Sequence, residues 1–387
     1  MATILLGLGG LALVLAVHPF LTYPIVLRLM RRFAPAPALH RGRSGEPLRV
    51  ALCVCAYNEA GVIERKIANM LDLRDRVPGL EILLYVDAAT DGTAAIAARY
   101  ADRIRLVVAT ERRGKTHGMN QLVAATAADI VVFTDANVMF DAEAIPRLAG
   151  AFADPIVGCA CGHLRYVTRT ATATAETGSL YWRLEEGIKQ LESDTGSVMG
   201  ADGSIFAIRR ALHRPPPPDI IDDMYVSLSI LCDGHRIVRV GDALATEESI
   251  AKPAEEFRRK IRIACQAFNV HRLLWPRLRR LDALTLFKYV SHKLLRWLSI
   301  YALLLGIALV VAGLLVAGQA MAVAVLAALA GGVLLFGAAR PAARAARLLD
   351  VLAALVATGI GVLRSLRGDR FQTWTPAASI RRERGAP

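Results

Sequence analysis

Aromatic residues and zinc-type cysteine sets are scarce in this sequence. Phe, Trp and Tyr make up only 6% of the 387 residues, and no RNA-binding signature accompanies the net charge of +13. We therefore expect no nucleic-acid partner and attribute the charge to basic residues that flank membrane segments. The six cysteines include two Cys-x-Cys pairs, Cys53/Cys55 and Cys159/Cys161, whereas structural zinc needs four ligands at other spacings. Buried, reduced thiols are the expected state.

Ionised side chains are absent from a long N-terminal run. Residues 2–27 contain no Asp, Glu, Lys or Arg, and the run is long enough to cross a bilayer core. Arg28, Arg31 and Arg32 follow it, which reverses the order of charges in a signal peptide. By the positive-inside rule, the run predicts an anchor that places the following domain in the cytoplasm, at the inner membrane.

A second uncharged stretch predicts a multi-pass protein in contact with membrane lipids. Trp297–Ala339 is long enough for two crossings, with Gly318-Gln319 at the tip of the hairpin. Val351–Leu363 is too short to span and favours an interfacial or re-entrant helix, so we expect three crossings and leave a fourth open. The basic amphipathic segment 254–274 is expected to lie along the membrane surface.

Between these segments, strand-like and helix-like patterns alternate. Residues 48–56 (LRVALCVCA) form a continuous apolar run, which is typical of a strand buried on both faces. Such alternation predicts an α/β fold with a mostly parallel sheet and helices on both faces, whose ligands bind beyond the carboxyl ends of the strands. The expected strands are 48–56, Glu81–Val86, Ile104–Val108, Ile130–Thr134 and a short one at Arg236–Val240, with helices at 60–73, Asp91–Tyr100 and 116–127.

Six segments occur in an order that resembles one enzyme family. They read VALCVCAYNEAGVIERKI, YVDAATDGT, RRGKTHGMN, VVFTDAN, GADGSIFAIRR and IIDDMYVSLSILCDGHRI. Residues 48–300 thus resemble the inverting family 2 glycosyltransferases of GT-A fold, in their membrane-integrated branch with poly-N-acetylglucosamine, chitin, hyaluronan and cellulose synthases. The resemblance implies transfer of a hexosyl or N-acetylhexosaminyl group from a nucleotide sugar, expected to be a UDP-sugar, to a growing polysaccharide or lipid-linked glycan.

The resemblance also implies a divalent metal. The nucleotide leaves with a diphosphate charge, which Mg²⁺ or Mn²⁺ can balance through oxygen ligands. Asp135 and Asn137 match the family's Asp-x-Asp motif, and two residues so spaced on a strand end can face one cation. The second Asp is replaced here by Asn, whose carbonyl oxygen remains a weaker ligand. A turn or helix cap at this position is the alternative.

Four residues are expected to bind the nucleotide. By resemblance, Asp87 would hold the base and ribose, Glu59 the ribose, and Tyr57 would pack on the base. Lys115 would reach the diphosphate. An Asx-turn at Asp87 and a surface position for Lys115 are the alternatives.

An acidic pair is expected to supply the catalytic base. Inversion by single displacement needs one group to accept the proton of the acceptor hydroxyl, and Asp223, preceded by Asp222, matches that position in the family. The alternative is that the pair only begins the helix expected at 224–232. Asp202 and Gly203 resemble the motif on the acceptor side.

One family motif is incomplete. The synthases carry Gln-x-x-Arg-Trp on an interfacial helix, but here the Gln and Trp are missing, and Arg259 or Arg262 would hold phosphate. Two other functions therefore stay open: a polyprenyl-phosphate sugar transferase, and a non-catalytic nucleotide-sugar-binding partner of a synthase. An auxiliary synthase or export subunit is a further partner of such enzymes. The expected organisation is an N-terminal anchor (1–30), a cytoplasmic catalytic domain (45–250), basic interfacial helices (251–296), a transmembrane hairpin (297–339) and an interfacial or re-entrant helix with a cytoplasmic tail (340–387).

Overall fold

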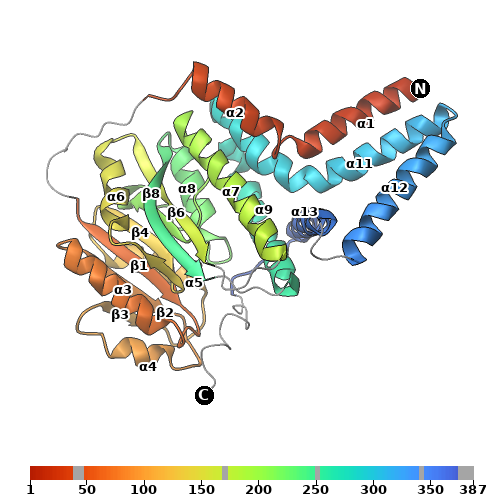
Figure 1. Ribbon diagram of the computed structural model, residues 1–387. Helices are drawn as coiled ribbons and strands as arrows, with labels where there is room; N and C mark the ends of the chain where they lie inside the picture. The colour runs from red at the N-terminus through yellow and green to blue at the C-terminus, as the bar shows by residue number, and fades with distance from the viewer. Residues whose placement is uncertain (38–47, 168–172, 249–252, 340–343, 374–387) are drawn as a thin grey trace.

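The computed structural model describes residues 1–37, 48–167, 173–248, 253–339 and 344–373. Its centre is an eight-stranded sheet with strand order β3-β2-β1-β4-β7-β6-β8-β5 (Figure 1). The strands are β1 (Val50–Ala56), β2 (Glu81–Val86), β3 (Arg105–Val108), β4 (Ile130–Asp135), β5 (Val138–Phe140), β6 (Val157–Val167), β7 (Ile205–Arg209) and β8 (Arg236–Glu248).

The sheet has a parallel half (β1–β4) and a mixed half (β5–β8). Strands β3, β2, β1 and β4 are parallel neighbours. Strand β7 runs antiparallel to both β4 and β6, β8 is parallel to β6, and β5 is antiparallel to β8. The helices around the sheet are α3 (Ile63–Arg76), α4 (Thr93–Ala98), α5 (Lys115–Ala125), α6 (Ala144–Gly150), α7 (Ala173–Asp194), α8 (Asp222–Cys232) and α9 (Pro253–Leu278).

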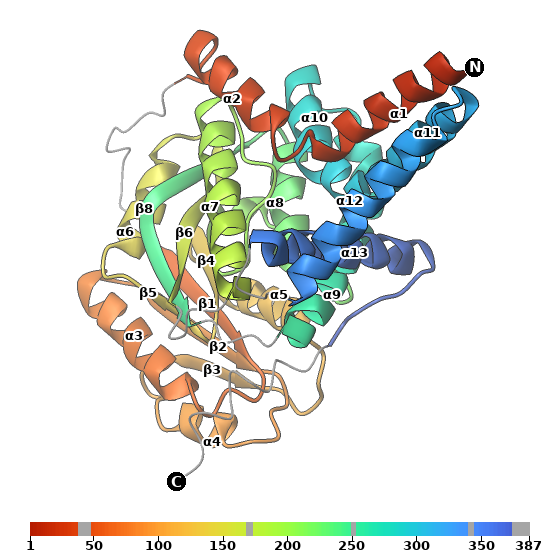
Figure 2. The same cartoon turned by 45° about the vertical axis from the view of Figure 1, so that its right-hand side comes forward.

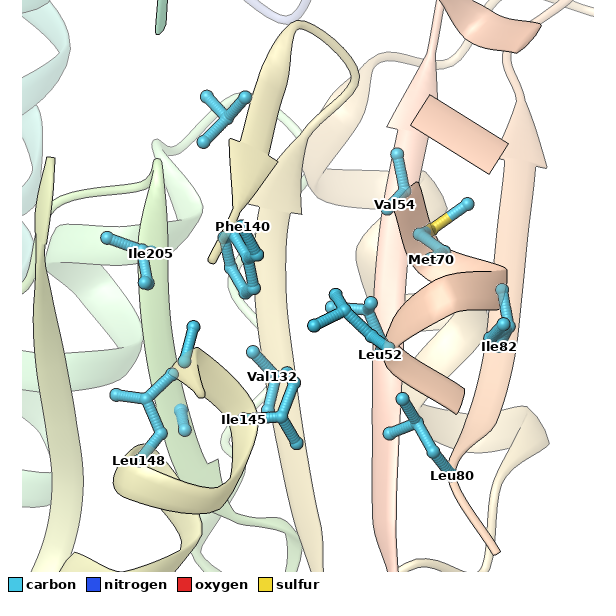
Figure 3. Packing of buried hydrophobic residues seen from close by; sticks show 14 of the residues in the cluster. Leu52, Val54, Met70, Leu80, Ile82, Val132, Phe140, Ile145, Leu148 and Ile205 are labelled. Carbon is cyan, nitrogen blue, oxygen red and sulfur yellow. The ribbon is translucent and has the colours of Figure 1, made fainter. Parts of the chain in front are cut away.

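Alternate residues of the strands build two cores on opposite faces of the sheet, because successive side chains on a strand point to opposite sides. On one face, the even-numbered residues of β1, β2 and β4 pack against α3 and α6, and Figure 3 shows the side chains meeting there. On the other face, the intervening residues pack against α5, α8 and α9. The first core includes Leu52, Val54, Met70, Val132, Ile145 and Leu148, and the second includes Ala51, Cys53, Leu122, Phe133, Leu228 and Phe268.

The α/β prediction is confirmed, and the parallel half matches it closely. Strands β1 to β4 begin and end within two residues of the expected ranges. Strand β8 continues beyond the expected Arg236–Val240, as far as Glu248. Strands β5 to β7 and helices α6 and α7 were not predicted as elements.

The N-terminal apolar run forms two helices instead of one anchor. Helices α1 (Ala2–Val17) and α2 (Thr22–Phe33) meet at an angle of 66°, which makes the pair a broken span or a re-entrant loop. Helix α1 packs against α11 (Leu295–Val316), and a Cβ added to Gly9 or Gly306 would press into the partner helix. Such small residues allow close approach of helices in a bilayer.

Helix α2 leaves this pair and packs against the sheet domain. Tyr23 is fully buried and donates a hydrogen bond of 2.6 Å to Glu192 of α7. Leu27 packs beside it, whereas Ile25 and Leu29 on the other side are about half exposed. An amphipathic helix of this kind is typical of a membrane interface.

The expected hairpin is present as α11 and α12 (Ala320–Ala339), and Gly318 turns the chain between them with a φ of +75°. Helix α10 (Ala283–Tyr289) and a π-helical turn (Val290–Leu294) lead into α11, so that Ala283–Val316 forms one long apolar helix. Helices α1, α11 and α12 project together from the sheet domain in both views (Figures 1 and 2).

The last described helix is longer than expected. Helix α13 spans Arg344–Leu366, and its part Leu348–Leu366 is long and apolar enough to cross a membrane, contrary to the short stretch inferred from the sequence. Two helices in the described residues are long and apolar enough to cross a membrane, and up to three spans result if the bent pair α1–α2 counts as one span. Figure 1 shows α13 nearly end-on while α11 and α12 lie across the view, so α13 crosses them. Gly361 lets it pack closely on α9. The expected tail beyond residue 373 lies outside the described residues.

Candidate active site

Acidic side chains from separate elements converge around Lys115, the first residue of α5. Its Nζ lies 2.6 Å from Oδ1 of Asp135, at the end of β4, and 3.8 Å from Oδ2 of Asp222, at the start of α8. A Cβ added to Gly203 would lie 2.9 Å from Oδ2 of Asp223 and 3.3 Å from Lys115 Nζ. The structure therefore brings together five of the residues singled out in the sequence.

The charges in this cluster shift the pKa values of its members. Burial alone would lower the pKa of Lys115, but Asp135, Asp222 and Asp223 together raise it above its usual value. Burial, and then the charge of Asp222, raise the pKa of Asp223 to about 7. A carboxylate with a pKa near neutrality is well matched to accepting a proton.

Asp222 and Asp223 occupy the first turn of α8, where carboxylates are also favoured by the helix dipole. Oδ1 of Asp223 accepts a hydrogen bond of 2.6 Å from the N–H of Met224. Asp222 is 5% exposed, and its Oδ2 has no hydrogen-bond partner among the described residues. The helix-start alternative and the catalytic role are thus compatible.

Asp202 is held by a buried lysine. Nζ of Lys189, on α7, donates to Asp202 at 3.2 Å and to Glu186 at 3.0 Å. Arg239 pairs with the other oxygen of Glu186 at 2.8 Å. Burial would raise the pKa of Asp202, but Lys189 and the N–H of Ser204 lower it below its usual value. Asp202 is therefore a stable anion beside the cluster. The sequence analysis did not single out Lys189, which holds it.

Asp87 holds the loop that begins α5. Its two oxygens each accept a hydrogen bond of 2.8 Å, from the N–H groups of Arg113 and Gly114, and the residue is only 3% exposed. Gly114 has a φ of +88°, which glycine adopts without strain. Asp87 thus positions Lys115 through the backbone, an arrangement different from the Asx-turn that was the alternative for this residue.

The loops after β1 and β2 are joined to each other. The side-chain oxygen of Asn58 accepts a hydrogen bond from the backbone N–H of Thr90, and its amide nitrogen donates one to the Thr90 hydroxyl. Asp91 accepts a hydrogen bond of 2.9 Å from the N–H of Thr93, the first residue of α4, and another from the N–H of Ala60. Thr93 Oγ1 in turn accepts a hydrogen bond from the backbone N–H of Glu59. This network fixes the loop in which Glu59 stands.

Tyr57 is covered on one face by an arginine. The guanidinium of Arg112 lies 3.6 Å from the centre of the Tyr57 ring, a cation–π distance. A base that packs on Tyr57 would therefore share the ring with Arg112.

Asn137 faces a glutamate that sequence analysis missed. Its Nδ2 donates to Oε1 of Glu247, on β8, at 2.9 Å. Burial, and then repulsion from Asp135, raise the pKa of Glu247 to about 7. Behind this turn, fully buried Lys66 donates to the carbonyl oxygen of Val138 at 2.5 Å. The turn from Asp135 to Val138 is thus held from the core and from β8.

Helix α9 brings two arginines to the edge of the site. Arg259 forms a salt bridge of 2.8 Å with Glu256. The negative charges of Glu256 and then of Glu247 contribute to raising the pKa of Arg259 against the effect of burial. Arg262 donates to Gln266. Burial, and then repulsion from Arg259, lower the pKa of Arg262 to about 10, while attraction to Asp135 opposes this.

Residues 367–373, which we call the C-terminal strap, lie against the loop that begins α5. Gln372 donates a hydrogen bond of 3.1 Å to the carbonyl oxygen of Arg113, and a Cβ at Gly114 would overlap the Gln372 carbonyl oxygen. Gln266 of α9 donates to a carbonyl oxygen in the strap at 2.9 Å. No sequence signal indicated that this segment reaches the site.

The residues present fit a hard divalent cation. Asp135, Asn137 and Glu247 carry oxygen atoms, the donor type that Mg²⁺ and Mn²⁺ prefer. The described residues hold no group of three or more His, Cys, Asp or Glu arranged for a metal. A cation here would therefore take its remaining ligands from donor phosphates and water, as Mg²⁺ commonly does in proteins.

Comparisons with known proteins point to a single family. The family described as "Glycosyltransferase like family 2" matches residues 47–266, more than half of the chain. An N-acetylglucosaminyltransferase of Rhizobium leguminosarum bv. viciae is 23% identical over 250 residues, which cover 60% of this chain and 59% of that protein. An N-acetylglucosaminyltransferase of Rhizobium sp. (strain N33) is 22% identical over 276 residues, 67% of this chain and 61% of that protein. The chain thus matches about three fifths of the length of these relatives.

One solved structure has the same overall fold. The mannosyltransferase PcManGT from Pyrobaculum calidifontis, in complex with GDP-Man and Mn²⁺, superposes with a TM-score of 0.71 at 23% identity. The match covers 94% of this chain and 99% of that one. At this identity, the likeness establishes the fold and leaves the chemistry to the residues.

Proposed function

We propose that this chain, which belongs to glycosyltransferase family 2, transfers a sugar with inversion from a nucleotide sugar to a membrane-associated glycan or lipid-linked acceptor. A UDP-sugar is the expected donor, and N-acetylglucosamine is our first choice of sugar because the curated relatives are N-acetylglucosaminyltransferases. The observation that carries the proposal is the convergence of Asp135, Asp223 and Lys115 at the carboxyl edge of the sheet.

In this mechanism Asp223 is the base. The acceptor hydroxyl loses its proton to Asp223 as its oxygen attacks the anomeric carbon, and the nucleoside diphosphate leaves from the opposite face. Asp223 is partly buried beside the buried Asp222, which limits the access of bulk water that would compete with the acceptor. Asp222, adjacent and negative, raises the proton affinity of Asp223. Gly203, which lies next to Asp223, and Asp202 would orient the acceptor.

The donor side is expected to depend on cations. Lys115 lies where it can bind the diphosphate, and Asp87 positions it through Gly114. A bound Mg²⁺ or Mn²⁺, held by Asp135 and Asn137, would neutralise the charge that develops on the leaving diphosphate. Arg259 and Arg262 provide further positive charge beside the acids, and Tyr57 and Glu59 remain the proposed contacts to base and ribose.

We place the catalytic domain on the cytoplasmic face of the inner membrane. Arg31 and Arg32 are in the last turn of α2, between the apolar helix α1 and the sheet domain, which agrees with the positive-inside rule. A single cysteine in place of the exposed Gly61, in a variant lacking the native cysteines, should react with a membrane-impermeant maleimide only after the cells are opened. Labelling of intact spheroplasts would contradict this orientation.

The function is tested with purified membranes that contain the full chain. They are incubated with UDP- and GDP-sugars and with Mn²⁺ or Mg²⁺, while nucleotide release is measured and the products are weighed. We expect UDP release that requires metal, and loss of about 10²–10⁴-fold in the rate for Asp223→Asn, the usual contribution of a general base. Equal turnover by wild type and Asp223→Asn would remove the base assignment. Release of GDP alone would shift the donor to a GDP-sugar.

A further inference from the structure

We propose that Glu247 supplies the second carboxylate of the metal site, and that Asn137 orients Glu247. This inference rests on the proposed function, because it concerns how this chain holds the cation of a nucleotide-sugar transferase. It also accounts for the departure from Asp-x-Asp: the negative charge that is missing at residue 137 is supplied by β8.

The contact between the two side chains has only one consistent orientation. In the ionised form that would bind a metal, the Glu247 carboxylate accepts hydrogen bonds and cannot donate them, so the Asn137 amide must present its NH₂ group to it, as in the 2.9 Å bond. Its carbonyl oxygen therefore points away from Glu247. With an Asp at residue 137, two carboxylates would meet at this distance, and their repulsion would separate them.

The backbone places Glu247 beside the metal turn. Glu247 is the register partner of Val138 across β5 and β8, and Val138 follows directly on Asn137. Lys66 fixes the same turn through the Val138 carbonyl oxygen. Asp135 ends β4 two residues before Asn137, and Asn137 contacts Glu247 at 2.9 Å, so the carboxylates of Asp135 and Glu247 flank the same short turn.

This region has more negative than positive charge. Lys115 engages Oδ1 of Asp135, which leaves Oδ2 for another ligand. The buried Oδ2 of Asp222 has no hydrogen-bond partner among the described residues. Like charges brought this close favour a cation between them. The acids here are Asp135, Asp222, Asp223, Glu247 and Glu256, and the cationic side chains are Lys66, Lys115, Arg259 and Arg262.

The test measures Mn²⁺ binding directly. The full chain in detergent is titrated with Mn²⁺ in the presence of UDP, and separately of GDP, while free Mn²⁺ is followed by electron paramagnetic resonance. We expect Glu247→Gln to bind Mn²⁺ at least about tenfold more weakly, the scale seen when groups that hold a metal are removed. Glu248→Gln is the matched control. Glu248 directly follows Glu247, but its carboxylate pairs with Arg65 at 3.1 Å, so this variant should bind Mn²⁺ as wild type does.

An exchange variant tests the orienting role. In Asn137→Asp/Glu247→Gln the carboxylate and the amide change places, so the hydrogen bond and the net charge are both kept. We expect it to regain most of the Mn²⁺ affinity lost in Glu247→Gln, whereas Asn137→Asp alone, with repelling carboxylates, should not exceed wild type. Thermal unfolding of each variant without metal reports whether the fold is kept.

Each outcome bears on a separate claim. Wild-type affinity in Glu247→Gln would overturn the assignment of Glu247, while metal-dependent UDP release by wild type would leave the proposed function standing. Loss without recovery in the exchange variant would overturn the orienting role of Asn137. No Mn²⁺ binding by wild type with either nucleotide would overturn this inference together with the metal dependence of the proposed function.

Discussion

The parallel half of the sheet holds the carboxylates of its loops through backbone N–H groups, whereas the mixed half holds its carboxylates through other side chains. In the parallel half, Asp87 is bonded to two backbone N–H groups and Asp91 to two more. In the mixed half, Lys189 pairs with Glu186 and Asp202, and the carboxylate of Glu247 bonds an amide. The parallel half is thus a rigid platform for the nucleotide-sugar donor, which we call the donor platform. The mixed half depends on a balance of charge that single substitutions can upset.

The largest expected effect follows from breaking this balance in the mixed half. The Lys189 side chain is 5% exposed and pairs with Glu186 and Asp202. Lys189→Met would remove this cation from the nearly buried Glu186 and from Asp202, whose side chain is 24% exposed. Removing one member of a buried pair usually costs about 3–5 kcal/mol in the free energy of unfolding. Because Glu186 keeps Arg239, we expect the lower end of that range, measured by denaturant or thermal unfolding of the full chain in detergent.

An exposed lysine provides the control for Lys189. Lys260 is 39% exposed and lies 3.7 Å from Glu256, so Lys260→Met should change stability by less than about 1 kcal/mol. Equal destabilisation by the two variants would mean that burial of the Lys189 network does not matter.

In the parallel half, removal of one charge should impair catalysis more than stability. Lys115→Met deletes the cation between Asp135 and the acidic pair and, in the proposed function, a contact to the diphosphate. We expect kcat to fall about 10²–10³-fold, as when one preorganised charge-stabilising donor is lost. Steady-state nucleotide release measures this, with Lys115→Arg as the variant that keeps the charge. A kcat unchanged in Lys115→Met would place the diphosphate elsewhere.

The parallel half could be predicted from the sequence because its signals are local. Its strands are continuous apolar runs, and its polar groups directly follow strand ends, as Asp87 and Asp135 do. Helix α7 escaped prediction because acidic and basic residues, among them Glu192 and Lys189, face the interior and disguise the apolar period. Glu247 and Gln372 escaped because their partners lie 110 and 259 residues away.

The acidic pair joins the two halves, and its pH dependence sharpens the comparison. Asp223 must be ionised to accept a proton, so kcat/KM should rise with pH through about 7 and be lost as pH falls below it. Asp222→Asn removes the neighbouring charge that raises this pKa, so the midpoint should move to lower pH by about one pH unit. Because burial is the larger cause and is unchanged, the midpoint should stay above the ordinary value for Asp. A midpoint at the same pH in both proteins would mean that another group controls the rate.

The smallest expected effect concerns the C-terminal strap, which comes from outside both halves and adds one hydrogen bond to the donor platform. The Arg113–Gly114 backbone already has its N–H groups fixed by Asp87, and Gln372 fixes the Arg113 carbonyl oxygen. Gln372→Ala should loosen this loop by about 0.5–1.5 kcal/mol, the net worth of one hydrogen bond. The KM for the donor should therefore rise about two- to tenfold, by the equivalence of 1.4 kcal/mol to a factor of ten, with kcat little changed.

Thr373→Ala, at an exposed position, is the control. A lower KM in Gln372→Ala would show that the strap competes with the donor for this loop.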